Sequence, residues 1–161
     1  MEAPNLWFAV AISAISAVST ITVAAYVAVI SRRQWQTNQE KLRFDLYDRR
    51  FEIYLTVLNF YQALVLWDGS AEQVALQMPF LRSYRESMFL FPPESGVYEL
   101  LTEFHTHAYN ITQYEKFRLI WQRAGLLIEK TNERLDSTDW IVRSIETLEE
   151  KMKPFISFHR L

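Results

Sequence analysis

The sequence predicts an all-α protein, with a single N-terminal transmembrane helix that continues into a cytoplasmic helical bundle. Three observations lead to this prediction. Residues 6–30 contain no charged side chain. Beyond that run, apolar residues recur every three or four positions, and no stretch alternates with period two. The 161 residues include only 3 glycines and 5 prolines, which is little turn material for many short strands.

The uncharged run 6–30 is long enough to cross a bilayer. As a helix it would extend about 37 Å at ~1.5 Å per residue, against a hydrocarbon core of roughly 30 Å. Arg32 and Arg33 follow at once, so the positive-inside rule places the C-terminal side in the cytoplasm. The expected parts are an extracytoplasmic tail at 1–5, a transmembrane helix at 6–30, a juxtamembrane linker at 31–41 and a cytoplasmic bundle at 42–161.

Small side chains form one stripe along the expected span. They lie three or four residues apart, which brings them to one face of a helix. Hydrophobicity does not draw helices together in lipid, whereas small residues let two backbones approach closely. The stripe therefore predicts a homo-oligomer contact, and the alternative is an ordinary alanine-rich anchor. The expected self-association face consists of Ala9, Ser13, Ala17, Thr20, Ala24 and Ala28.

The first two helices of the expected bundle have clear end signals. After a polar break at 36–40, a broad apolar stripe continues until Asp68 and Gly69 stop it. Ser70 with Gln73 forms a capping-box pattern for a second helix. We expect this second helix to end near residue 90.

Three further helices are expected after that point. The segment Pro92-Pro93-Glu94 ends the second helix and starts the third. Thr112 with Glu115 repeats the capping-box pattern and predicts the start of a fourth. Residues 136–139 offer N-caps for a fifth, which should end near Pro154.

Basic residues beside the span are expected to contact lipid head groups. Each contributes roughly 1 kcal/mol near an anionic surface, although a topology signal alone would also explain them. The 17 Lys and Arg residues all follow the span, where 18 of the 19 acidic residues also lie. This balance disfavours nucleic acid as a partner, because nucleic-acid binders concentrate positive charge. The expected head-group contacts are Arg32, Arg33, Lys41 and Arg43.

No motif in the sequence fixes a reaction. His105 and His107 project about 200° apart on a helix and cannot share a metal, and Glu103 with His107 supplies only two ligands. The chain has no cysteine, phosphate-binding loop or serine elbow. We therefore predict no catalytic residue, no metal and no cofactor. Asp45 and Arg49 have the i,i+4 spacing of an exposed ion pair.

Three stretches together resemble a widespread bacterial family: KLRFDLYDRRFEIY at 41–54, SMFLFPPESGVYELL at 87–101 and KPFISF at 153–158. Its members join one N-terminal span to a helical domain. The resemblance therefore implies a single-pass protein of the bacterial inner membrane, and it implies no activity. The layout is more weakly similar to membrane-anchored accessory proteins of type VI CRISPR systems. Those proteins combine one span with a divergent HEPN-like domain and assemble as a pore. The Arg and His pattern of the HEPN family is missing here, and only Lys153 precedes His159 at a comparable spacing.

These observations predict a non-enzymatic, single-pass membrane protein that self-associates and acts as a membrane effector or pore component in anti-phage defence. One alternative is a membrane-tethered scaffold or sensor that binds another cytoplasmic protein. A second alternative is a degenerate HEPN-like nuclease that uses Lys153 and His159. Membrane lipids and further copies of the chain are the expected partners.

Overall fold

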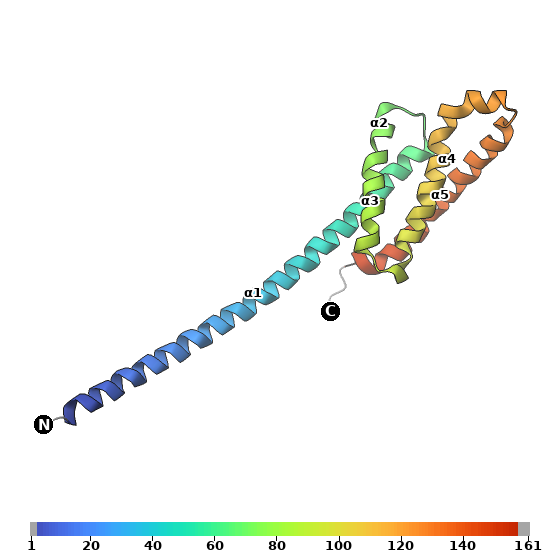
Figure 1. Ribbon diagram of the computed structural model, residues 1–161. Coiled ribbons are helices and arrows are strands. Elements are labelled where there is room, and N and C mark those ends of the chain that lie inside the picture. The colour runs from blue at the N-terminus through green and yellow to red at the C-terminus, as the bar shows by residue number, and fades with distance from the viewer. Residues whose placement is uncertain (1–2, 158–161) are drawn as a thin grey trace. The chain divides into compact units, whose positions relative to one another are not determined.

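Helices make up nearly all of the described chain, which confirms the predicted all-α class. The computed structural model describes residues 3–157, with side chains except at 3–7, 9, 12, 14, 15, 17, 18 and 21. No β-strand occurs in this range. The elements in chain order (Figure 1) are α1 (Ala3–Val65), α2 (Ala71–Ala75), α3 (Gln77–Leu90), the 3₁₀ helix η1 (Pro93–Ser95), α4 (Val97–Arg123) and α5 (Leu127–Ile156).

The chain divides into two units, residues 1–44 and residues 45–161. The first unit contains the N-terminal part of α1, and the second contains the rest of α1 and every later helix. The polar segment 36–40 is helical, because its Gln and Glu residues are good helix formers and Thr37 donates to the Arg33 carbonyl. Within the described part of the chain, no helix has a stretch long and apolar enough to cross a membrane.

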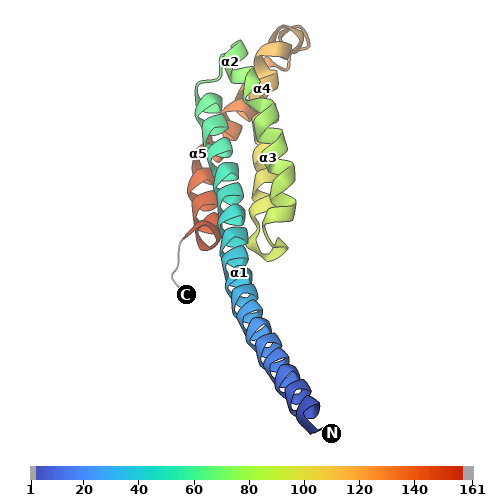
Figure 2. The ribbon, with the colours of Figure 1, turned by 90° about the vertical axis from the view of Figure 1, so that its left-hand side faces the viewer.

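The second unit is a helical bundle around one core. Figure 1 shows α4 and α5 side by side, and Figure 2 shows the part of α1 that belongs to this unit beside α3. The ring centroids of Phe60 and Phe80 lie 4.7 Å apart, and those of Phe80 and Phe104 lie 5.3 Å apart. These rings join α1, α3 and α4. The core also includes Ile53, Val57, Leu64, Leu101, Ile141, Ile145, Leu148 and Met152.

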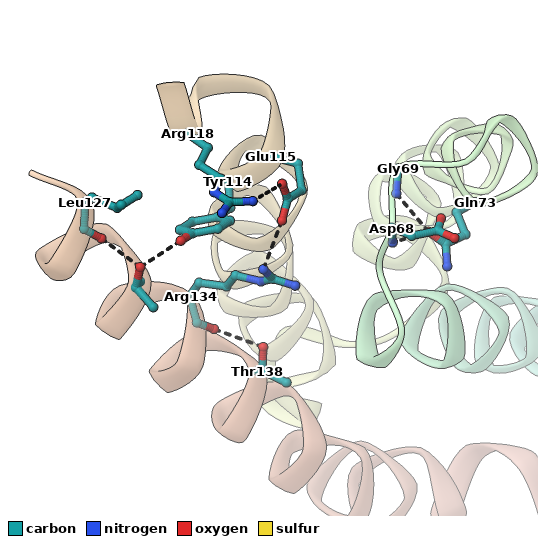
Figure 3. Close-up of polar contacts among 10 residues, drawn as sticks. Asp68, Gly69, Gln73, Tyr114, Glu115, Arg118, Leu127, Arg134 and Thr138 are labelled. Atoms are coloured by element: carbon teal, nitrogen blue, oxygen red, sulfur yellow. Dashed lines mark hydrogen bonds and ion pairs between the residues drawn. The ribbon is translucent and has the colours of Figure 1, made fainter. Parts of the chain in front are cut away.

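The predicted N-cap at Ser70 is confirmed, although Gln73 acts differently from a capping-box residue. Ser70 Oγ accepts a hydrogen bond from the Gln73 backbone N–H at 3.5 Å. The Gln73 side chain reaches further back, where its Oε1 accepts from the N–H groups of Asp68 and Gly69 at 2.8 and 3.2 Å (Figure 3). Its amide nitrogen donates to the Leu66 carbonyl at 2.9 Å. One side chain therefore holds the whole turn between α1 and α2.

Two of the predicted helix starts are wrong, and the predicted second helix forms two helices, α2 and α3. Thr112 lies inside α4, and residues 136–139 lie inside α5. The Thr112 hydroxyl donates to the Tyr109 carbonyl at 3.2 Å, and the Thr138 hydroxyl donates to the Arg134 carbonyl at 2.9 Å. Such bonds to the preceding turn allow a Thr inside a helix, so a capping pattern without a preceding stop signal does not begin one.

The turn between α4 and α5 depends on Gly125. Its φ is +73°, in the left-handed region that favours glycine. Leu126 N–H donates to the Trp121 carbonyl at 2.9 Å, and Gly125 N–H donates to the Gln122 carbonyl at 3.3 Å. This bond pair is a Schellman motif, which satisfies the last carbonyls of α4. After the turn, α5 continues to Ile156 and so ends near Pro154, as predicted.

Replacing Gly125 by Ala should destabilise the bundle by about 1 to 2 kcal/mol, the cost of a left-handed conformation for a residue with a Cβ. No atom lies within 4 Å of an added Cβ, so the cost comes from the backbone alone. Gly125→Asn should cost less, because Asn tolerates this region better. Urea unfolding of the three proteins measures the difference. Equal stability of all three would show that the turn does not need a left-handed residue.

Candidate functional site

The residues of the expected self-association face all lie on α1, in the first unit. Ser13 Oγ donates to the Val10 carbonyl at 2.9 Å. Thr20 Oγ1 donates to the Ser16 carbonyl, also at 2.9 Å. These bonds satisfy both hydroxyls on the backbone of their own helix, as Ser and Thr do in an apolar surrounding. The side chains of Ser13, Thr20, Ala24 and Ala28 are exposed, and those of Ala9 and Ala17 lie outside the described side chains.

Large apolar side chains on the same segment are also exposed. Phe8 is 69% exposed and Tyr26 is 67% exposed. Where exposed apolar side chains form one large patch, such a patch is typical of a site that binds a membrane or another protein. The other exposed members are Val10, Val23, Val27 and Val29.

The basic residues expected at lipid head groups are exposed along the first unit. The described ion pairs within 4 Å include none of them. Arg32 and Arg43 are eleven residues apart, close to three helical turns, so they share one face of α1. Their charges are therefore available to an anionic group. The other two residues of this set are Arg33 and Lys41.

Arg50 makes its contacts within the bundle. Its Nε donates to the Leu90 carbonyl at 2.8 Å, at the C-terminal end of α3. Its guanidinium carbon lies 5.5 Å from the ring centre of Phe91 and 5.3 Å from that of Phe155. Helix C-termini present unpaired carbonyls that attract cations, and the two rings add cation–π attraction. Burial lowers the pKa of Arg50. One side chain thus connects α1, α3 and α5.

The neighbouring Arg49 has no such role. It is exposed, and the predicted ion pair with Asp45 is not among the ion pairs of the described residues. The sequence shows two adjacent arginines and does not distinguish them. What separates them is their contacts, because only Arg50 reaches the carbonyl of Leu90 and the rings of Phe91 and Phe155 among the described interactions.

The two histidines of EFHTH lie in separate environments, as their spacing predicts. His105 stacks on Tyr84 with ring centroids 5.5 Å apart. His107 stacks on Trp140 of α5 at 4.4 Å, and its Nδ1 lies 3.1 Å from Ser137 Oγ. Among the described residues, no three potential ligands gather closely enough to hold a metal ion.

The bonds of Ser137 determine the protonation state of His107. Ser137 is 2% exposed, and its Oγ accepts a hydrogen bond from Asn110 Nδ2 at 3.2 Å. No backbone carbonyl in the described structure accepts the Ser137 hydroxyl hydrogen, so His107 Nδ1 is the remaining acceptor. The imidazole is then neutral, with its proton on Nε2. Burial lowers the pKa of His107, while the charge of Glu103 acts in the opposite direction.

The Ser137 and His107 pair is a structural bond and not a nucleophile with its base. A catalytic serine must reach a substrate carbonyl, and Ser137 is closed off between the helices. Its hydroxyl instead connects α4 to α5 through two side chains.

A second polar network joins the parts of α4 and α5 that lie nearest to their connecting turn (Figure 3). The hydroxyls of Tyr114 and Thr131 lie 2.7 Å apart. Glu115 is reached by Arg134 at 3.3 Å and by Arg118 at 3.7 Å. Exposed ion pairs contribute little to stability, so the network chiefly fixes how the two helices are aligned.

A cavity of about 360 Å³ opens between α4 and α5. Helical periodicity did not predict this cavity. The sequence predicted helix starts at Thr112 and at 136–139, whereas the cavity lies between α4 and α5 as the structure bounds them. From α4 it is lined by Tyr109, Asn110, Gln113, Phe117 and Trp121, and from α5 by Lys130 and Glu133.

Lys153, one of the two residues considered for a nuclease, lies at an open hollow of about 610 Å³ between α1 and α5. Glu146, Glu149 and Glu150 line the same hollow, and the Tyr54 hydroxyl donates to Glu149 at 2.8 Å. Three carboxylates repel a phosphate backbone, which does not favour RNA at this place. His159 lies outside the described residues.

Comparison with known proteins finds no matching family model, no similar curated protein and no similar solved structure.

Replacing Arg50 by Lys should destabilise the bundle by about 1 to 2 kcal/mol, although the charge is kept, because Lys has neither the Nε donor nor the flat guanidinium. Arg49→Lys is the matched control, and it should change the stability by less than about 0.5 kcal/mol. Urea unfolding at one pH measures both. Equal effects of the two substitutions would contradict the assigned role of Arg50.

Stability should fall as the pH drops below about 6.5, the ordinary pKa of His107, because the folded state keeps this imidazole neutral while the unfolded chain protonates it. His107→Gln removes this contribution, so its stability should decrease less between pH 7.5 and pH 5.5. Urea unfolding at the two pH values measures the slopes. The slopes of the wild type and the variant would coincide if His107 were protonated equally in both states.

Proposed function

We propose that the chain is a single-pass bacterial inner-membrane protein that associates with further copies through its N-terminal helix. The observation that supports this most is the uncharged run 6–30, followed at once by Arg32 and Arg33. The sequence of this run, and not its structure, supports the proposal, because the structure does not describe several of the side chains in the run. The positive-inside rule then gives a cytoplasmic bundle.

The exposed apolar side chains of the first unit support a lipid environment. Transfer of apolar surface out of water is worth roughly 25 cal/mol per Å². Side chains as exposed as Phe8 and Tyr26 have not gained this energy within the chain. Tyr26 lies near the C-terminal end of the run, where the amphipathic ring of a tyrosine suits the interface between lipid and water. Lipid would cover the apolar residues, and Arg32 would lie among the head groups.

The stripe of small residues supports association between copies. In lipid, two helices attract each other by close packing, which alanine, serine and threonine allow. The hydroxyls of Ser13 and Thr20 donate to their own backbone, so the face can enter lipid before it meets a partner. The helix could therefore insert first and associate afterwards.

We further propose a role as a membrane effector or pore component of anti-phage defence. Several copies that pack through the stripe would bring their helices into a ring. No charge lies between residues 6 and 30, so any path through the ring would be lined by hydroxyl and apolar groups.

A second candidate is a membrane-tethered scaffold or sensor. The turn between α4 and α5 supports it, because Leu119, Ile120 and Ile128 are 70%, 60% and 79% exposed there. Apolar side chains gathered near one turn are typical of a surface that binds another protein. Such a protein would act by recruiting a cytoplasmic partner to the membrane.

Ala24→Leu should reduce the number of copies per particle, because a larger side chain holds the two backbones apart. Ala25→Leu is the matched control: it is the same substitution at the next residue, about 100° around the helix and off the stripe. The full chain is extracted from washed membranes with detergent, and its native mass is measured. We expect an oligomer for the wild type and the control, and a smaller particle for Ala24→Leu.

Three outcomes would contradict the proposal. Release of the protein by an alkaline wash without detergent would exclude a membrane-spanning helix. A monomeric wild type would exclude self-association. Equal masses of the Ala24→Leu and Ala25→Leu oligomers would show that copies associate through another surface.

A further inference from the structure

We infer that the cavity between α4 and α5 binds a small, neutral, planar heteroaromatic molecule whose edge carries a hydrogen-bond donor beside an acceptor. Amides, lactams and amidine-like ring edges have this pattern. The inference concerns only the bundle and does not depend on the membrane anchor. At about 360 Å³, the cavity is near the lower end of the range for small-molecule sites, which begins at roughly 300 Å³.

Aromatic rings form one wall of the cavity. Tyr109, Gln113, Phe117 and Trp121 lie four residues apart and therefore share one face of α4. The centroids of Phe117 and Trp121 are 5.9 Å apart, with an angle of 44° between the ring planes. Both rings line the cavity and are half-buried, so packing holds them while part of each ring stays accessible. Aromatic linings of this kind favour a flat ligand that can pack against the rings.

Two carboxamides supply the polar groups. The Asn110 amide nitrogen donates to the buried Ser137 hydroxyl, which in turn donates to His107. This arrangement fixes the orientation of Asn110 and leaves its Oδ1 as an acceptor. Neither Asn110 Oδ1 nor the Gln113 carboxamide bonds to another described residue, and no buried polar side-chain atom there lacks a partner. Both groups are therefore accessible from the cavity.

The charge of the site selects a neutral ligand. Lys130 Nζ lies 2.7 Å from both carboxylate oxygens of Glu133. The opposite charges of Lys130 and Glu133 cancel within the cavity wall. The hydrogen bond to Glu133 raises the pKa of Lys130. An anionic ligand would have to compete with Glu133 and would place its own acceptors against Asn110 Oδ1. A neutral amide can instead donate to Oδ1 and exchange a second bond with Gln113.

Nicotinamide and adenine are suitable probes, because each is a flat neutral ring system with a donor beside an acceptor. Nicotinate is the matched control ligand, with the same ring and a carboxylate in place of the amide. We expect the full-length chain in detergent to bind at least one of the two probes with a Kd of about 1 mM or lower. Nicotinate should bind at least about tenfold more weakly than nicotinamide, a difference of roughly 1.4 kcal/mol. Isothermal titration calorimetry measures these affinities.

Gln113→Glu should weaken binding of the probe by about tenfold, because it replaces the amide donor with a charged acceptor. Gln122→Glu is the matched control on the same helix. The Gln122 side chain is exposed and does not line the cavity, so binding should not change. Circular dichroism of both variants shows whether the helical fold is kept, and Gln113 makes no bond whose loss would unfold it.

The inference is overturned if both probes bind with a Kd above about 1 mM, if nicotinate binds as tightly as nicotinamide, or if the two Gln→Glu variants behave alike. A short single-stranded oligoadenylate distinguishes a free molecule from a base within a strand. With Lys130 paired to Glu133, we expect no gain over adenine for the oligoadenylate. Much tighter binding of the strand would overturn the assignment to a free small molecule.

Discussion

The rest of the bundle depends on the packing of three aromatic rings, those of Phe60, Phe80 and Phe104. Each ring comes from a different helix, and each is almost completely buried. Aromatic contacts of this kind contribute about 0.5 to 1.5 kcal/mol per pair beyond the burial of their area. The rings join α1 and α3 to the N-terminal half of α4, whereas the last turns of α4 lie beside the start of α5. The cavity and the network around Glu115 lie between the C-terminal half of α4 and the start of α5.

Much of the fold could be predicted from the sequence because helical periodicity reports burial directly. In the apolar stripe expected before Asp68, Ile53, Val57 and Leu64 are buried as predicted. Leu42 and Leu46, which belong to the same expected stripe, are exposed. The turns after α1 and α3 fall at their Gly and Pro signals. The errors came from local polar patterns. Thr112 and residues 136–139 match N-cap patterns, yet tertiary packing of α4 against α5 extends both helices through them. Gly125 was the residue that marked the true boundary between α4 and α5, because a glycine in the left-handed region ends a helix. A favourable N-cap residue alone does not begin a new helix.

The candidate sites could be predicted to different extents. The stripe from Ala9 to Ala28 is visible in the sequence because it lies on one helix, where spacing alone determines a face. The role of Arg50 needs Leu90 and Phe155, which are distant in sequence. The cavity needs a specific alignment of Phe117 and Trp121 with Lys130. Periodicity contains no information about such alignments, since it describes each helix separately.

Synthesis of the chain begins with α1, and some of the partners of α1 are made last. Arg50 bonds to a carbonyl 40 residues later, and Tyr54 bonds to Glu149, 95 residues later. The α4 and α5 helices, in contrast, are joined by a short turn, so they can pair soon after both have been made. Until α3, α4 and α5 have all followed, the apolar face of residues 53–64 lacks its full set of packing partners. The order of synthesis therefore leaves this apolar surface partly uncovered for a time, which makes early binding of α1 to a chaperone or a membrane an advantage for folding.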